Sequence, residues 1–184
     1  MKLSYQNYTL HEATLDDVYL LTEWWNDGNI MAHAGFPKGL NIESHEIEKI
    51  ILKNSIEKAI LFIIRFGEKS IGETNYRVCD NKEIEIGIKI VDEESQNKGI
   101  GTIVIHILLR FLYLQGHRII NLDTNLNNLR AQHFYEKIGF TKEKTENDSW
   151  CDQNGKLQSS VFYKINLDRY CFEESFIDNI RIQI

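Results

Sequence analysis

A short turn with two glycines is the segment of this sequence best suited to chemistry. Its seven residues are Gln96, Asn97, Lys98, Gly99, Ile100, Gly101 and Thr102. The turn follows a strand-like run at 83–91 and precedes a long run with helical apolar periodicity that ends at Leu114. The first backbone N–H groups of a helix have no partner within the helix, and the helix dipole adds positive charge there. Because glycine leaves such groups accessible, the turn predicts an anion site, to which Lys98 could add a full charge.

This glycine turn differs from the two best-known nucleotide-binding motifs. It lacks the glycine spacing and the Gly-Lys-Ser/Thr ending of the P-loop, and it lacks the three glycines of the dinucleotide fingerprint. The simplest alternative is a helix start that uses glycine only for close packing. In the same way, Gln96 could cap the helix without touching a phosphate. The pattern therefore indicates an anion site without identifying the anion.

A second motif lies at 125–140. Five of its positions are spaced as Asn-x-x-Ala-x-x-x-Tyr-x-x-x-Gly-Phe, and they are Asn128, Ala131, Tyr135, Gly139 and Phe140. The segment is predicted to form a short helix over 127–138, closed by Gly139. Asn128 is well placed to cap this helix, and capping alone would explain it. Tyr135 could be a core residue, so this motif also has a purely structural alternative.

The remaining sequence supplies the strands and helices that must position both motifs. Strands are expected at 5–13, 59–66, 70–78, 83–91, 118–123, from 140 onward and at 159–167. Helices are expected from Thr14, with Asp17 at the capping-box position, from 42 or 44 to 55, at 99–114 and at 127–138. Three antiparallel strands precede the long helix, and one parallel step crosses it. The predicted fold class is therefore α/β with a mixed sheet.

The length of 184 residues suits one domain, which we expect to span 1–184. Its core is expected at 5–167, followed by a C-terminal extension at 168–184. This extension is charged at first and then apolar, with Phe176, Ile177, Ile180, Ile182 and Ile184. It could pack on the domain, add a strand or contact a second subunit.

Composition and charge argue against several classes of function. The formal net charge of −6 disfavours a nucleic-acid partner and fits a cationic substrate. No run of about 18 apolar residues suggests a membrane span, and the N-terminus has no signal-peptide pattern. Cys79, Cys151 and Cys171 lie far apart, which predicts reduced thiols in a cytoplasmic protein. The six histidines show no ligand spacing, so no metal is expected.

Taken together, the two motifs resemble those of the GCN5-related N-acetyltransferases, the GNAT superfamily. The glycine turn is similar to the Gln/Arg-x-x-Gly-x-Gly/Ala motif of that family, and the 125–140 segment to its C-terminal signature. The resemblance covers about 5–167. The opening segment and the hairpin with Trp150 resemble the branch of ribosomal-protein N-terminal and aminoglycoside 6′-acetyltransferases. This implies a GNAT fold: a mixed, mostly antiparallel central sheet with a splayed parallel strand pair, flanked by about four helices.

The resemblance also implies a donor, acetyl-CoA, and a role for each motif. The pyrophosphate of coenzyme A would lie on the backbone amides of 97–102, next to Gln96. The pantetheine arm would pair with the edge of the 83–91 strand, at Ile88, Lys89 and Ile90. Asn128 would hold the arm from its other side, and Tyr135 would protonate the leaving thiolate. None of the cysteines lies in either motif, so the acetyl group would pass directly to a primary amine in a ternary complex.

The acceptor amine must lose a proton before it attacks. Glu85 is the first candidate for this base and Glu73, on the neighbouring strand, is the second. For both, a solvated strand carboxylate is the alternative. Acceptor contacts are expected from Trp25, Asp27 and His33, with a core tryptophan and a surface-loop histidine as the alternatives.

The expected acceptor is a small-molecule amine or a peptide N-terminus, and many proteins of the superfamily form homodimers. Two other functions remain open from the sequence. One is a non-catalytic module that binds acyl-CoA, and the other is a nucleotide-binding protein that uses the same glycine turn.

Overall fold

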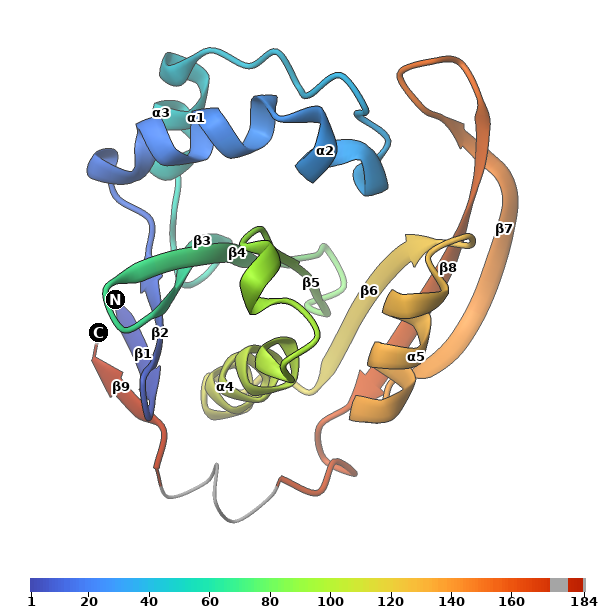
Figure 1. Cartoon of the computed structure of the whole chain (residues 1–184). Helices are drawn as coiled ribbons and strands as arrows, with labels where there is room; N and C mark the ends of the chain where they lie inside the picture. The colour runs from blue at the N-terminus through green and yellow to red at the C-terminus, as the bar shows by residue number, and fades with distance from the viewer. Residues whose placement is uncertain (173–178, 184) are drawn as a thin grey trace. The chain divides into compact units, whose positions relative to one another are not determined.

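The computed structural model describes residues 1–172 and 179–183 of the chain (Figure 1). Contacts between residues divide the chain into two compact units. Unit 1 consists of Met1–Ala13, Asn54–Ile120 and Asn166–Ile184, and unit 2 consists of Thr14–Lys53 and Asn121–Ile165. Within the described residues, no helix is long and apolar enough to cross a membrane.

The secondary structure confirms the predicted α/β class. The α-helices are α1 (Val18–Asn26), α2 (Gly28–Met31), α3 (Ser44–Ile51), α4 (Ile100–Leu114) and α5 (Leu129–Ile138). Short 3-10 helices are η1 (Leu15–Asp17), η2 (Ala32–Ala34) and η3 (Glu93–Ser95). The strands are β1 (Lys2–Tyr5), β2 (Tyr8–Glu12), β3 (Ala59–Phe66), β4 (Lys69–Val78), β5 (Ile84–Ile90), β6 (Ile119–Asn125), β7 (Thr141–Cys151), β8 (Leu157–Asn166) and β9 (Arg181–Gln183). They form a mixed, mostly antiparallel sheet with one parallel pair.

In unit 1 the strands are hydrogen-bonded in the order β5-β4-β3-β2-β1-β9, and every one of these pairs is antiparallel. The predicted strands at 59–66, 70–78 and 83–91 are confirmed as β3, β4 and β5. The strand predicted at 5–13 is present as β2, over Tyr8–Glu12, but the prediction missed β1 and the turn between the two strands. The strands form a hairpin because the chain turns at Gln6, which has a positive φ of 52°. The alternation of this segment continues through the turn, so its pattern does not reveal the hairpin.

The core of unit 1 lies between its sheet and α4, the long helix that follows the glycine turn (Figure 1). Tyr76 of β4 and Phe111 of α4 are buried, and their ring centroids are 6.1 Å apart. The α4 side chains from Val104 to Leu109 are all buried. A helix that is packed on nearly every side moves little, so the backbone at the start of α4 is held in place.

Unit 2 contains α1, α2, α3, α5, the β7–β8 hairpin and most of β6. Its start confirms the predicted capping box, in which Thr14 and Asp17 bond reciprocally, although the first turn is the 3-10 helix η1. The helix predicted to end at 55 ends at Ile51. The loop after α1 contains α2 and η2, and α2 accounts for the fifth helix where about four are expected.

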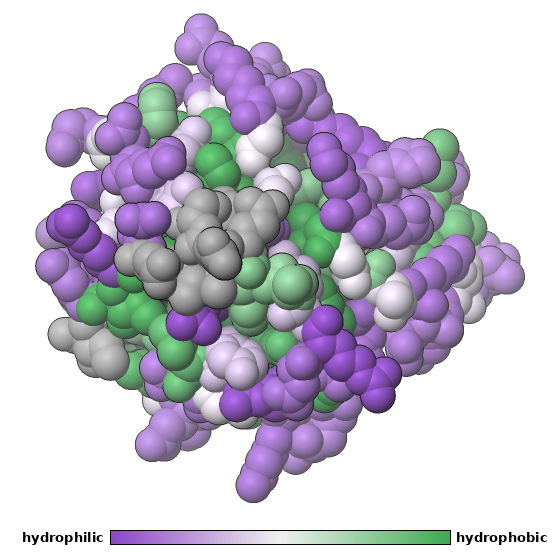
Figure 2. Space-filling view, turned by 90° about the horizontal axis from the view of Figure 1, so that it is seen from below, coloured by the Kyte–Doolittle hydropathy of each residue, from purple (hydrophilic) through white to green (hydrophobic). Residues whose placement is uncertain are grey.

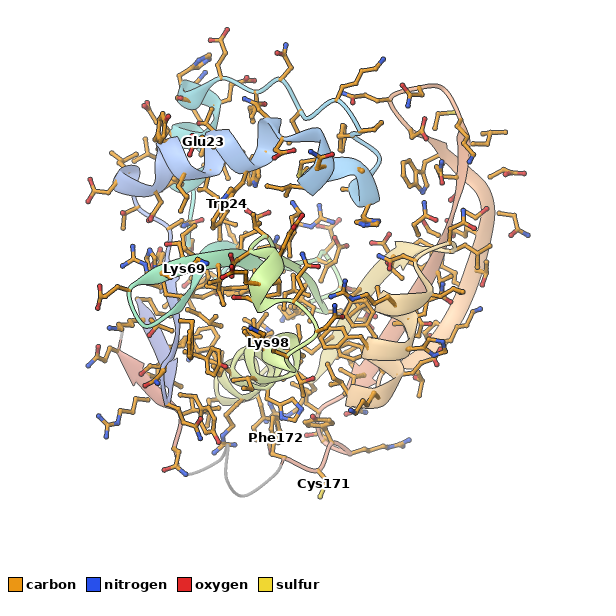
Figure 3. The ribbon with its side chains drawn as sticks, in the orientation of Figure 1. Glu23, Trp24, Lys69, Lys98, Cys171 and Phe172 are labelled. Atoms are coloured by element: carbon orange, nitrogen blue, oxygen red, sulfur yellow. The ribbon has the colours of Figure 1, made fainter. Side chains whose placement is uncertain are left out.

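The C-terminal extension packs on unit 1 and adds a strand to it. Its β9 pairs with β1, and Ser4 lies opposite Arg181. Before that, Tyr170 bonds to His106 of α4 and the Phe172 ring lies 5.5 Å from the Tyr113 ring. Figure 3 labels Cys171 and Phe172 in this segment. Figure 2 shows one face of the molecule, which is mostly hydrophilic with some exposed hydrophobic residues. The extension residues Phe176, Ile177 and Ile184 lie outside the described residues.

Candidate active site

The glycine turn presents a row of backbone amides at the start of α4. Asn97 and Gly99 have positive φ values of 60° and 76°, which turns the chain sharply before the helix begins at Ile100. No described residue accepts a hydrogen bond from the amides of 97–101. We call these five groups the amide cradle. Unpaired amides at the start of a 15-residue helix form a binding site for an anion.

Two side chains of the turn have different surroundings. The Gln96 Nε2 group donates to the Ile90 carbonyl oxygen at 3.0 Å, so this side chain fixes the end of β5 to the turn. It does not cap α4, whose N-cap residue is Gly99. Lys98 is exposed, and its label in Figure 3 marks the turn before α4. Its charge is therefore available to a ligand of the cradle.

One face of the unit 1 sheet carries the two predicted carboxylates. Side chains alternate along a strand, and Tyr76 contacts α4, so Glu73 and Arg77 lie on the opposite face of β4. On β5, Lys89 lies directly across from Glu73, and Glu85 lies directly across from Arg77. We call these four residues the charged row.

The two carboxylates of the charged row differ in environment. The Glu73 side chain is only 8% exposed, and its Oε1 atom lies 3.0 Å from Lys89 Nζ. Glu85 is 43% exposed, and both of its oxygens accept hydrogen bonds from Arg77 Nη2, at 2.8 and 2.9 Å. The structure therefore places both candidates on one face, with Glu73 buried next to a lysine and Glu85 more exposed and bound to an arginine.

In unit 2, Tyr135 of α5 lies buried among aromatic rings. The ring centroids of Phe134, Phe140 and Tyr163 are within 5.1 to 6.0 Å of it. Burial, with a smaller contribution from the Asp123 carboxylate, raises the pKa of Tyr135 to about 12. The phenol therefore keeps its proton at neutral pH, as a proton donor must. A tyrosine that is only a core residue would be packed in the same way, so this environment agrees with both roles of Tyr135, proton donor and core residue.

Asn128 caps α5, as the structural alternative requires. Its Oδ1 atom accepts a hydrogen bond from the Ala131 amide at 3.1 Å. The cap uses only the carbonyl oxygen of the side chain, so the Nδ2 group of Asn128 can still donate to a ligand.

Unit 2 also contains a cavity of about 440 Å³, and Asn128 is one of its lining residues. The others are Ala32, His33, Gly35, Asn125, Asn127, Leu129, Arg130, Trp150, Asp152 and Gln158. His33 thus lines a cavity, and its contact with the acceptor stays a prediction. The other two predicted acceptor residues are not among its lining. Asp27 caps α2 by accepting a hydrogen bond from the Asn29 amide at 2.7 Å. Trp25 is half-buried on α1. Figure 3 labels Glu23 and Trp24 of the same helix.

The wall formed by the β7–β8 hairpin is tied to the loop after α2. The Gln153 side chain donates to the Gly39 carbonyl oxygen at 2.7 Å and accepts from the Lys38 amide at 3.0 Å. The Trp150 ring lies against Gly35, where a Cβ atom would be 2.3 Å from the ring. Only glycine leaves room for the ring at this position. The loop and the hairpin therefore form one continuous wall.

A chain of hydrogen bonds orients the polar residues of the cavity. Asn125 Nδ2 donates to Gln158 Oε1 at 2.8 Å, and Gln158 Nε2 donates to Asp152 Oδ2 at 2.9 Å. Hydrogen bonds from the backbone amides of Lys156 and Asn154, with that from Gln158, hold the pKa of Asp152 below its usual range. The cavity thus contains a permanent negative charge. The sequence prediction missed Asn125, Asp152 and Gln158, because nothing in their spacing shows that they meet.

Comparison with known proteins identifies the family to which this chain belongs. The model of the acetyltransferase (GNAT) family matches residues 3–140. The chain belongs to the GNAT family. Among curated proteins it is similar to the aminoglycoside N(6′)-acetyltransferases type 1 of Klebsiella pneumoniae and Serratia marcescens. Each is 24% identical over 156 residues, which cover 77% of this chain and 78% of the relative.

Solved structures of other acetyltransferases share the GNAT fold. The spermidine N-acetyltransferase of Vibrio cholerae, in complex with CoA and spermine, has a TM-score of 0.79 at 22% identity over 90% of this chain and 98% of that one. The ribosomal L7/L12 alpha-N-protein acetyltransferase RimL, in complex with CoA, has a TM-score of 0.76 at 18% identity over 88% and 95%. At such low identities, these similarities show the fold.

As a GNAT protein, the chain is an N-acetyltransferase that uses acetyl-CoA as its donor. The amide cradle fits this donor, because five N–H groups without a partner in the described part of the chain, together with a helix dipole, match the two negative charges of a pyrophosphate. The comparisons give no support to a non-catalytic module. The acceptor of the reaction is an amine.

Proposed function

We propose that this GNAT enzyme acetylates a primary amine of a small, multiply charged cation, by direct transfer in a ternary complex. The observation that carries the donor half is the amide cradle, whose five amides have no partner among the described residues and lie between η3 and α4. The observation that supports the acceptor half is the cavity of unit 2, in which a held carboxylate lies with an aromatic ring. Acetyl-CoA supplies an activated acetyl group as a thioester.

On the donor side, the chain holds the cofactor chiefly through its backbone. We assign the pyrophosphate to the amides of 97–101, with Gln96 and Thr102 at the two ends and the exposed Lys98 as an added charge. The edge of β5 at Ile88, Lys89 and Ile90 pairs with the pantetheine arm. Asn128 contributes its Nδ2 group. Backbone amides are fixed before the ligand arrives, so they need no reorganisation.

On the leaving-group side, Tyr135 donates the proton that the thiolate takes up. A phenol with a pKa of about 12 is protonated at every physiological pH. Its burial also keeps water from competing with it for the transfer. The resemblance of the 125–140 motif to the family signature is the basis for assigning this role to the Tyr135 hydroxyl group.

On the nucleophile side, a carboxylate of the charged row takes the proton of the incoming ammonium, which has no lone pair until it loses that proton. Glu85 is the candidate from the sequence, and Glu73 is the second. We favour Glu73, because its side chain is far less exposed to water than that of Glu85, which also binds Arg77 through both oxygens. Comparing Glu73→Gln with Glu85→Gln distinguishes them. We expect Glu73→Gln to lower kcat by about tenfold or more at neutral pH, and Glu85→Gln to change it less.

The acceptor lies in the cavity of unit 2. Asp152 keeps its negative charge, and the Trp150 ring can contact a cation through its face. His33 lines the same cavity, whereas Trp25 and Asp27 are assigned to its outer approach. The chain's net charge of −6 favours the approach of a cation. Aminoglycosides and polyamines are therefore the acceptor classes to test first, and a peptide N-terminus is the third.

The test is release of the CoA thiol from acetyl-CoA in the presence of aminoglycosides, polyamines or peptide amines. We expect saturable release with one of the first two classes and its loss in Asp152→Asn, through a higher KM. Release with peptides alone would overturn the acceptor assignment. No release with any amine, with acetyl-CoA still bound, would overturn the catalytic assignment.

Three further assignments belong to this proposal. The chain acts as a single domain, in the cytoplasm, where its three free cysteines stay reduced. We also propose a homodimer. The described part of the extension pairs within its own chain through β9, so the dimer would use another surface. Light scattering of the purified protein tests this, and a monomeric mass would contradict it.

A further inference from the structure

We propose that Lys69, Asp92 and Ser95 act together as positioning residues that set the affinity for the pyrophosphate part of acetyl-CoA. We call them the Lys69–Asp92–Ser95 cluster. All three lie in unit 1, on β4 and on the turn between β5 and the amide cradle. The inference rests on the proposed role of the amide cradle.

Asp92 connects the turn to β4 by side chain and by backbone. Its Oδ1 atom lies 2.7 Å from Lys69 Nζ, and its Oδ2 atom accepts a hydrogen bond from Ser95 Oγ. The backbone amides of Val91 and Asp92 both donate to the Ile71 carbonyl oxygen, at 2.9 and 3.1 Å. One carboxylate therefore joins the first residue of β4 to the last residue of η3.

The cluster ends where the amide cradle begins. Ser95 is 9% exposed and is followed by Gln96, whose amide donates to the Glu93 carbonyl oxygen at 3.1 Å and whose side chain holds Ile90. The next residue, Asn97, has a positive φ of 60°, which is uncommon for non-glycine residues, although asparagine adopts it more readily than most. A turn that is fixed up to Gln96 aims the following amides in one direction.

Charge gives the cluster a second effect on the cradle. Asp92, Glu93 and Glu94 precede the amide cradle in the sequence, and negative charges close to a bound pyrophosphate repel it. Lys69, labelled in Figure 3, contacts Asp92 and lies 3.8 Å from Glu94 Oε2. It therefore offsets part of the negative charge next to the cradle.

An exposed ion pair contributes little to folding stability, and the Lys69 side chain is 56% exposed. Removing the charge of Lys69 should thus leave the fold intact. This separates a role in cofactor binding from a merely structural role, because the two predict different changes.

The experiment compares two donors in the full-length protein: acetyl-CoA and acetyl-pantetheine, which lacks the pyrophosphate and the adenosine. The variants are Lys69→Met and Asp92→Asn. The control is Lys58→Met, because Lys58 is exposed and forms no ion pair with a described residue. For Lys69→Met we expect the Kd and KM of acetyl-CoA to rise by about three- to tenfold, because both the contact to Asp92 and the positive charge are lost. For Asp92→Asn we expect a smaller rise, because the loss of a negative charge offsets part of the lost positioning. In both variants kcat should stay within about twofold, because only binding is weakened. The kcat/KM of acetyl-pantetheine should stay unchanged, and Lys58→Met should match the wild type throughout.

Two results would overturn the inference. One is an unchanged affinity for acetyl-CoA in both variants, and the other is an equal loss of kcat/KM with both donors, which indicates general damage. If Asp92→Asn does not fold, Lys69→Met alone still decides between these outcomes. If the wild type binds acetyl-CoA no better than acetyl-pantetheine, the amide cradle itself is wrongly assigned, and this result is distinguishable from a failure of the cluster.

Discussion

We assign the donor side of this GNAT enzyme mainly to backbone groups of unit 1, and the acceptor side to side chains that line a cavity of unit 2. The amide cradle uses one continuous segment, 97–101, and needs glycine to keep its amides open. The cavity draws its lining from three separate segments, represented by His33, Asn128 and Asp152. Backbone recognition suits a donor that is constant across the family, and side-chain recognition suits an acceptor that differs between its members.

The largest effect is expected from Tyr135→Phe, which removes the hydroxyl and keeps the ring. We expect kcat to fall by about a hundredfold, the lower end of what general acid catalysis contributes. The Kd of acetyl-CoA, measured by calorimetry, should stay within about twofold, because the backbone groups of the donor side are untouched. Unchanged turnover would show that Tyr135 is only a core residue.

The next largest effect is expected from Gly35→Ala, which disturbs the acceptor side alone. A Cβ at this position would lie 2.3 Å from the Trp150 ring, and the φ of +91° is unfavourable for alanine. Overpacking of this kind costs about 1 to 3 kcal/mol. We expect a higher acceptor KM and a lower melting temperature, with the Kd of acetyl-CoA unchanged. A parallel loss of acetyl-CoA affinity would break the distinction between the two sides.

Alkaline pH affects the side chains of unit 2 and leaves backbone amides unaffected. Burial raises the pKa values of Tyr135 and Tyr163 to about 12, from an ordinary value of 10.0. Above pH 10 the unfolded chain loses these protons before the folded chain does, so stability falls as the pH rises from about 10 to about 12. For Tyr135 alone, the loss approaches about 2 kcal/mol. Denaturant unfolding at pH 9 and pH 11.5 measures it, and Tyr135→Phe should show a smaller loss.

The smallest of these effects is expected from Gly99→Ala, the donor-side counterpart of Gly35→Ala. Nothing lies within 4 Å of an added Cβ, so only the positive φ of 76° opposes alanine. This conformation costs about 1 kcal/mol for alanine, so the Kd of acetyl-CoA should rise by about fivefold while the acceptor KM stays unchanged. A change in the acceptor KM alone would contradict the assignment of this turn to the donor.

The contrast between the two sides also explains what the sequence could predict. The glycine turn, β5 and α4 follow one another along the chain, so local pattern suffices to find them. The capping role of Asn128 is equally local, since it concerns a residue three positions away. By contrast, the bond between Gln158 and Asn125 joins residues 33 positions apart, and no spacing rule indicates it.

Two features of the structure were missed from the sequence for physical reasons that can be named. The β1–β2 hairpin was hidden because Gln6 turns without the glycine or Asn-Gly pair that usually marks such a turn. Asp27 is predicted to contact the acceptor, and the structure adds a role that the sequence did not indicate, because its carboxylate caps α2. An aspartate before a short helix has two possible functions, and sequence alone does not choose between them.

The most direct test of this account is the response of individual backbone amides to coenzyme A. An amide NMR titration of the labelled protein reports each N–H group separately. We predict that the largest shifts occur at 97–101, which have no partner in the described chain. Binding with shifts concentrated elsewhere, or no binding, would contradict the claim that these amides hold the donor.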